Sequence, residues 1–175
     1  FVGHSNKVTS VAWSPDGTHI LTASLDGTAR IWDTTTGENT LTLTLTHADK
    51  DRLTSVAWSP DGTHILTASR SGTTRIWDAT TREDTPKPKL TLTHTDSVRA
   101  AAWSPDGRHI LTASDDGTAR IWDTTTGSNT LTLTHTNLVT SVAWSPDGTH
   151  ILTASMDGTT RIWDATTRED TPKPK

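Results

Sequence analysis

The sequence predicts an all-β protein made of four repeated antiparallel sheets, and three observations carry this prediction. The recurring string VAWSPDG, once AAWSPDG, places tryptophans 45, 45 and 41 residues apart, at Trp13, Trp58, Trp103 and Trp144. A second tryptophan follows each of them after 19 positions, always within the string RIWD. Threonine, which is β-branched and favours strands, makes up about a fifth of the chain. A period of about 40–45 residues with a Trp-Asp dipeptide is typical of four-stranded sheets that stack side by side.

The first repeat shows how each sheet divides into strands and turns. Val8 to Ser14 alternates apolar and small polar residues, which predicts a first strand that ends at the tight turn Pro15-Asp16-Gly17. His19 to Ser24 predicts the second strand. The turn Leu25-Asp26-Gly27 follows, and Thr28 to Asp33 predicts the third strand. These short strands and tight turns indicate an antiparallel meander.

The fourth strand is predicted where apolar residues and threonine alternate strictly. This pattern covers Leu41 to Thr46, and its counterparts are Leu90 to Thr93 and Leu131 to Thr134. No segment shows the 3.6-residue period of a helix, so the class is all-β.

The repeat boundaries divide the chain at about 4–46, 47–93, 94–134 and 135–175. Phe1 to Gly3 is interpreted as the remnant of a closing outer strand. Repeats one and three share TARIWDTTTG, whereas two and four share TTRIWDATTREDTPKPK, which indicates a duplicated pair. The last repeat has no fourth strand after Asp164. That strand could come from the chain's own start, from a neighbouring copy, or from a longer parent sequence.

These features resemble the WD-repeat β-propeller family, and the resemblance covers almost the whole chain in four copies. It implies a hydrogen-bonded set in each blade: a His before strand one, a Thr in strand two, an Asp in the second turn and the Trp of strand three. The matching residues are His4, Thr22, Asp26, Trp32, His47, Thr67, Trp77, His94, Thr112, Asp116, Trp122, His135, Thr153, Asp157 and Trp163. Blade two has Ser71 where Asp is expected, so its network should be weaker, because a neutral hydroxyl replaces a charged acceptor. Only His4 follows a glycine, a departure from the family's Gly-His signature.

The resemblance also implies a closed ring of blades. An open array would leave apolar faces and strand edges in water, and the family commonly closes with seven or eight blades. The fold class is therefore a β-propeller of four-stranded antiparallel blades, four per chain. We expect two chains to complete an eight-bladed ring as a head-to-tail homodimer.

Two chemical interpretations of the histidines compete with a structural role. Thr, His and Asp side chains form catalytic triads in hydrolases, but here the grouping recurs in several blades and includes a Trp whose indole N–H needs a partner. The second set, His19, His64, His109 and His150, could be imagined as a metal-binding ring, yet successive blades hold equivalent positions too far apart. We therefore expect no enzyme activity, no catalytic residue, no metal and no cofactor.

Composition narrows the classes of partner. A net charge of -4 and a pI near 6.0, without a block of basic residues, argue against a surface for nucleic acid or anionic membranes. The chain has no cysteine, no apolar run long enough to cross a membrane and no signal-peptide pattern near its start. We expect a cytoplasmic protein.

The differences among the repeats cluster in two loops that, in the family, open on the same rim of the ring. Rigid strands that present variable loops suit recognition, so we predict a partner-binding rim for a protein or peptide. Its candidate residues are Leu25, Arg70, Asp115, Met156, Lys50 and Arg52. The alternative is a purely architectural product of repeat amplification or engineering, whose only property is folding and self-assembly.

Overall fold

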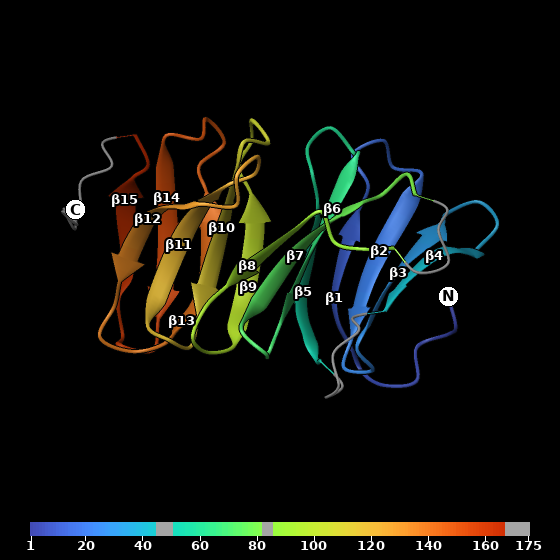
Figure 1. Ribbon diagram of the computed structural model, residues 1–175, viewed down its shortest axis with the longest axis horizontal. Coiled ribbons are helices and arrows are strands. Elements are labelled where there is room, and N and C mark those ends of the chain that lie inside the picture. The colour runs from blue at the N-terminus through green and yellow to red at the C-terminus, as the bar shows by residue number, and fades with distance from the viewer. Residues whose placement is uncertain (45–50, 82–85, 167–175) are drawn as a thin grey trace.

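The computed structural model describes residues 1–44, 51–81 and 86–166, which form four antiparallel sheets in chain order (Figure 1). We call these sheets blades one to four, counted from the N-terminus. Blades one to three each contain four strands, and within the described residues blade four contains three. In every blade the strands follow one another in sequence order, so the predicted all-β meander is confirmed.

The strands of each blade recur with nearly the same bounds. Blade one consists of β1 (Val8–Trp13), β2 (His19–Ser24), β3 (Thr28–Asp33) and β4 (Asn39–Thr44). Blade two consists of β5 (Leu53–Trp58), β6 (His64–Ser69), β7 (Thr73–Asp78) and β8 (Leu90–Thr93). Blade three consists of β9 (Val98–Trp103), β10 (His109–Ser114), β11 (Thr118–Asp123) and β12 (Asn129–Thr134). Blade four consists of β13 (Val139–Trp144), β14 (His150–Ser155) and β15 (Thr160–Asp164).

Three boundaries differ from the sequence prediction. Strands β4 and β12 begin at Asn39 and Asn129 rather than at Leu41 and Leu131, because each ladder continues past a register shift that brings the asparagine opposite the tryptophan of the third strand. The end predicted for β4, residues 45 and 46, lies outside the described residues. Strand β1 ends one residue before Ser14, whose N–H already bonds to the carbonyl of His19 at 2.9 Å and closes the hairpin. Gly17 completes that turn with φ of 72°, a conformation that favours glycine.

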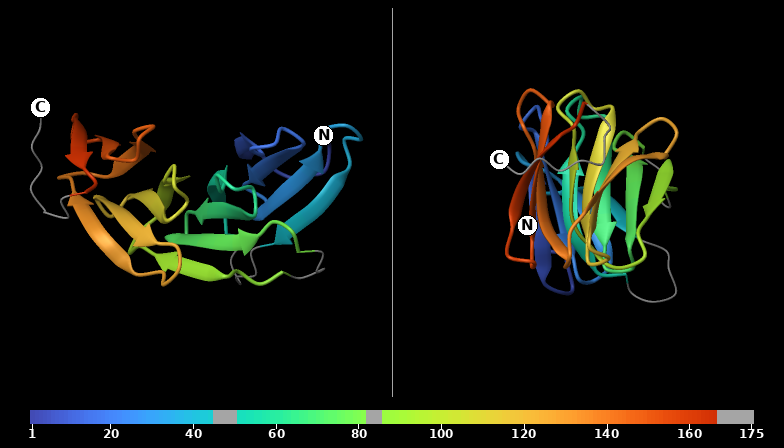
Figure 2. Two further views of the ribbon diagram at one scale, coloured as in Figure 1. Left: turned by 90° about the horizontal axis from the view of Figure 1, so that it is seen from above. Right: turned by 90° about the vertical axis from the view of Figure 1, so that its left-hand side faces the viewer.

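The four blades stand side by side along an open arc, with blade one and blade four at opposite ends (Figure 2). Strands β1, β5, β9 and β13 lie along its concave side, and neighbouring members of this set contact one another. Strands β4, β8 and β12 lie along the convex side. The described residues contain no helix of the length and hydropathy that a membrane crossing requires.

The hydrophobic core lies between the blades rather than in one central mass. Leu21 and Ile31 of blade one, for example, share a cluster with Val56 and Trp77 of blade two. The side chains of β2 and β3 are thus covered by the next blade along the chain. This arrangement explains how a chain with 31% apolar residues can bury them, since each junction needs only a thin layer.

Each first strand carries a β-bulge at the same place. The register shifts around Thr9, Thr54, Arg99 and Thr140, so each of these residues is the extra one in its ladder. A bulge redirects a side chain out of the regular alternation. Two of the bulged threonines reach the next blade: Thr9 donates to the carbonyl of Leu53 at 2.8 Å, and Thr54 to that of Val98 at 2.7 Å.

Candidate interaction rim

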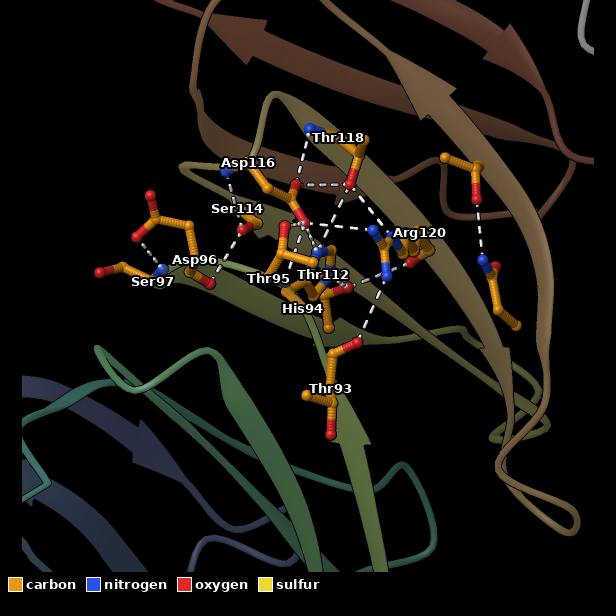
Figure 3. Close-up of polar contacts among 12 residues, drawn as sticks. Thr93, His94, Thr95, Asp96, Ser97, Thr112, Ser114, Asp116, Thr118 and Arg120 are labelled. Carbon is orange, nitrogen blue, oxygen red and sulfur yellow. Dashed lines mark hydrogen bonds and ion pairs between the residues drawn. The ribbon is translucent and has the colours of Figure 1, made fainter.

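A buried hydrogen-bond network lies beneath the predicted rim in blade three (Figure 3). His94 Nδ1 is 2.9 Å from Asp116 Oδ2, and His94 Nε2 is 2.7 Å from Thr112 Oγ1. The indole N–H of Trp122 donates to the same Thr112 oxygen at 2.8 Å. The network joins the loop before β9, the strand β10, the turn after it and the strand β11.

The same network recurs in blades one and four. His4 contacts Asp26 at 3.0 Å and Thr22 at 2.8 Å, and His135 contacts Asp157 at 2.9 Å and Thr153 at 2.7 Å. Trp32 and Trp163 each donate to the threonine of their own blade at 2.8 Å.

The directions of these bonds follow from the charge on the aspartate. Burial opposes ionisation of Asp116, but hydrogen bonds from Thr118 and His94 outweigh it and lower the pKa of Asp116 to about 2. The carboxylate therefore accepts a hydrogen bond from the N–H at His94 Nδ1, and His94 Nε2 accepts one from the hydroxyl of Thr112. Burial lowers the pKa of His94, which favours this neutral imidazole. Every hydrogen-bonding atom in the series Trp122, Thr112, His94 and Asp116 then has a partner.

Arginines of the third strands tie this network to the preceding blade. Arg120 donates to Asp116 at 3.1 Å and to the carbonyl of Thr93, the last residue of blade two, at 3.3 Å. Arg161 makes the equivalent bonds to Asp157 and Thr134, at 3.1 and 3.0 Å. These guanidinium groups therefore hold the blades in register.

Blade two lacks the His–Asp contact within its described residues and uses a different carboxylate. Trp77 still donates to Thr67 at 2.9 Å, whereas His47 lies outside the described residues. Ser71 occupies the turn position of the aspartate, and its N–H and hydroxyl donate to Asp51 at 3.2 and 2.8 Å. Asp51 is buried. Sequence reasoning missed this residue, although one signal exists: His47 precedes the first residue of its blade's first strand, Leu53, by six positions, whereas in the other blades the offset is four.

The four variable turn residues occupy equivalent, firmly held positions. The N–H groups of Leu25, Arg70, Asp115 and Met156 each bond to the carbonyl of the residue before the blade's first strand, at 2.9 to 3.0 Å. Arg70 and Met156 are exposed, the latter by 66%, whereas Leu25 and Asp115 are half-buried. Arg52 is exposed, and Lys50 lies outside the described residues. The two variable loops thus meet at one rim.

Asp115 is already engaged by a residue that sequence reasoning did not single out. Arg99 Nε and Nη2 donate to the two carboxylate oxygens of Asp115, each at 2.7 Å. Arg99 is the bulged residue of β9, where the other first strands have threonine. The bulge turns this side chain toward the rim, so two of the positions at which repeat three differs from the other repeats form one ion pair.

The opposite rim carries the second histidine set, and clefts lie there between neighbouring blades. One of them, of about 520 Å³, is lined by His109, Trp144 and Asp147 among others. His109 and Trp144 lie 6.4 Å apart between ring centroids. Among the described residues, no group of three or more His, Asp or Glu side chains is placed to hold a metal ion.

Comparison with known proteins agrees with this architecture. Residues 2–170 match the family described as PD40, the TolB β-propeller domain. A segment of 35 residues is 54% identical to the U3 small nucleolar RNA-associated protein 21 of Saccharomyces cerevisiae and 57% identical to its homologue of Schizosaccharomyces pombe. A segment of the same length is 49% identical to the periodic tryptophan protein 2 of S. cerevisiae. Each match covers 20% of this chain and only 4% of the relative's length.

Proposed function

The chain belongs to the family of the TolB β-propeller domain, a family of WD-like propeller repeats, and from this premise we propose that it is a non-catalytic scaffold that binds another protein. The binding surface of this proposal is the rim formed by the β2–β3, β6–β7, β10–β11 and β14–β15 turns with the loops before the first strands. One observation carries it. Four nearly identical frames hold the same backbone position by the same hydrogen bond and present four chemically different side chains there. A rigid frame lowers the entropy cost of presenting such side chains to a partner.

The Thr–His–Asp groups support the non-catalytic part of this proposal. The side chain of Thr112 is fully buried, as is that of Thr153. Each hydroxyl oxygen already accepts from a tryptophan and lies within hydrogen-bond distance of a histidine. A nucleophile needs access to substrate and a free base, and neither hydroxyl has these.

Arg70 and Met156 are the proposed contact residues. Both are exposed, and Arg and Met are enriched at protein interfaces. Asp115 is proposed to contribute only when a partner competes for it, because Arg99 already satisfies its carboxylate.

We further propose that the scaffold works as a closed ring in which two chains supply four blades each. The open arc of Figure 2 leaves one blade face uncovered at each end. Exposure of such apolar faces to water is unfavourable. Because all the junctions between neighbouring blades are of one kind, the two end faces of a second copy can cover the two end faces of the first.

The test is affinity capture with the purified chain as bait, using Arg70→Glu and Met156→Glu as rim variants. Arg108→Glu is the matched control, since Arg108 is an exposed arginine on the turn between β9 and β10 at the opposite rim. We expect the wild type and the control to retain the same protein, and each rim variant to weaken retention about tenfold or more. Equal retention by all four baits would exclude this rim. A wild-type bait that retains nothing specific would favour the architectural alternative.

A further inference from the structure

Blade one exposes side chains that the other blades bury against a neighbour. Val11 is 66% exposed, whereas its equivalent Val56 is 6% exposed, since blade one covers it. Trp13 is 64% exposed, whereas Trp58, at the same place in blade two, is half-buried in the core cluster between blades. This end of the arc therefore presents an uncovered first-strand face.

Blade four exposes the opposite half of the same junction. Leu152 and Ile162 are 43% and 46% exposed. Their equivalents Leu21 and Ile31 of blade one are 0% and 3% exposed, because blade two covers them. The face that blade four leaves open is thus the face that a first strand normally covers.

Polar groups at the two ends complement each other in the same way. Inside the chain the bulged Thr54 donates to the carbonyl of Val98, and the N–H of Val56 donates to Ser10 Oγ at 3.3 Å. If blade one of a second copy followed blade four, the same pattern would pair the hydroxyl of Thr140 with the carbonyl of Val8 of that copy. It would also pair the N–H of Val11 of that copy with the hydroxyl of Ser141.

The first three residues lie where the end of a preceding blade would lie. Gly3 precedes His4 as Thr93, the end of β8, precedes His94. Arg120 donates to the Thr93 carbonyl, and Gly3 is so close to the guanidinium of Arg30 that a β-carbon there would clash with it. Val2, however, is 98% exposed, whereas its equivalent Leu92 is buried against the third strand of its own blade. Phe1 to Gly3 therefore occupies the position that the outer strand of a preceding blade would have, but it has no third strand of its own blade to pair with.

We propose that a second copy of this chain docks head to tail, with Val11 and Trp13 of each copy packed on Leu152 and Ile162 of the other. Phe1 to Gly3 of each copy then lies beside β15 of the other and extends the three strands described for blade four, with Val2 opposite Thr160. The inference rests on the ring closure proposed above and gives it a residue-level register. The occupant is the same chain, because each uncovered face matches the face that this chain's own blades already bury.

The experiment is native mass spectrometry of the full chain at micromolar concentration, with the variants Trp13→Glu and Ile162→Glu. The wild type should show twice the 18.9 kDa mass of one chain. Each variant alone should be monomeric, because every junction needs one face of each kind. An equimolar mixture of the two variants should regain the doubled mass, since one intact junction can form between them.

The mixture separates this geometry from its competitors. A dimer through two like faces would survive one of the two substitutions, and would overturn the proposal. A monomeric wild type, or an open series of larger assemblies, would overturn it as well. Met156→Glu, at the exposed rim, should stay dimeric; loss of partner retention by this variant without loss of the dimer distinguishes the rim from the junction. Val11→Glu replaces Trp13→Glu if circular dichroism shows that the latter does not fold.

Discussion

The indole N–H of Trp122 donates to the hydroxyl oxygen of Thr112 at 2.8 Å, and this single oxygen also binds His94. Thr112→Val keeps the shape of the side chain and removes the oxygen. The buried N–H of Trp122 and the Nε2 of His94 then lose their partner, and each unsatisfied group costs about 1–3 kcal/mol. We expect the free energy of unfolding, measured by urea titration, to fall by about 2–4 kcal/mol. The exposed Thr134→Val is the control, and an equal loss there would refute the network's role.

Asp51 tests the substitute network of blade two. Asp51→Ala removes the acceptor for both Ser71 bonds. It also removes the buried carboxylate whose charge partly offsets the lowering of the Arg75 pKa by burial. We expect a loss of about 1–3 kcal/mol in the free energy of unfolding. Asp96→Ala is the matched control, because Asp96 stands at the equivalent loop position of blade three but is exposed; we expect a change within about 0.5 kcal/mol there. If both variants lose the same amount, Asp51 has no special role.

Acidification should destabilise the protein in two steps whose signs follow from the pKa shifts. Burial lowers the pKa of His94, so the unfolded chain binds a proton first and stability declines as pH falls through about 6.5. The pKa values of Asp26 and Asp116 are lowered to about 2 in the folded protein. Their contribution to the free energy of unfolding is therefore fully present above the pKa of an aspartate in the unfolded chain, and it is lost as the pH falls toward 2.

Chemical unfolding at a series of pH values from 7 downward measures both steps. His94→Gln should flatten the curve of unfolding free energy against pH above pH 5. The unfolded variant no longer takes up a proton near the pKa of an unfolded histidine, because the imidazole is gone. A stability that rises on acidification from pH 7 would contradict the neutral state of His94.

The strands and the members of the repeated network could be predicted from sequence because they recur at fixed offsets. His94 and Asp116 stand 22 residues apart, as do His4 and Asp26, and the structure brings both pairs within hydrogen-bond distance. Periodic alternation likewise placed β8 at its observed bounds.

Arg99 and Asp51 could not be found in this way, because their roles depend on local backbone geometry. The orientation of Arg99 follows from a β-bulge, and the bulge has no residue type of its own that would mark it in the sequence. The role of Asp51 depends on a loop two residues longer than its equivalents, which shifts every residue after His47 relative to the repeat.

The ion pair between Arg99 and Asp115 gives the last prediction. The Arg99 side chain is 41% exposed, and pairs of this kind contribute about 0.2–1 kcal/mol to stability. A double-mutant cycle with Arg99→Thr and Asp115→Ala should therefore give a coupling energy below about 1 kcal/mol that shrinks at high salt. Arg99→Thr also installs the residue that other first strands carry, whose hydroxyl could bond to the carbonyl of Val139 as Thr54 does to Val98.

A weak coupling has a functional consequence, because a partner's cationic group could then displace Arg99 from Asp115 at little cost. In that case Arg99→Thr should strengthen binding of a basic partner to the rim, whereas Asp115→Ala should weaken it. A coupling energy above about 2 kcal/mol would instead show that the pair is a structural clamp. The available partner surface would then shrink to the exposed side chains of Arg52, Arg70 and Met156.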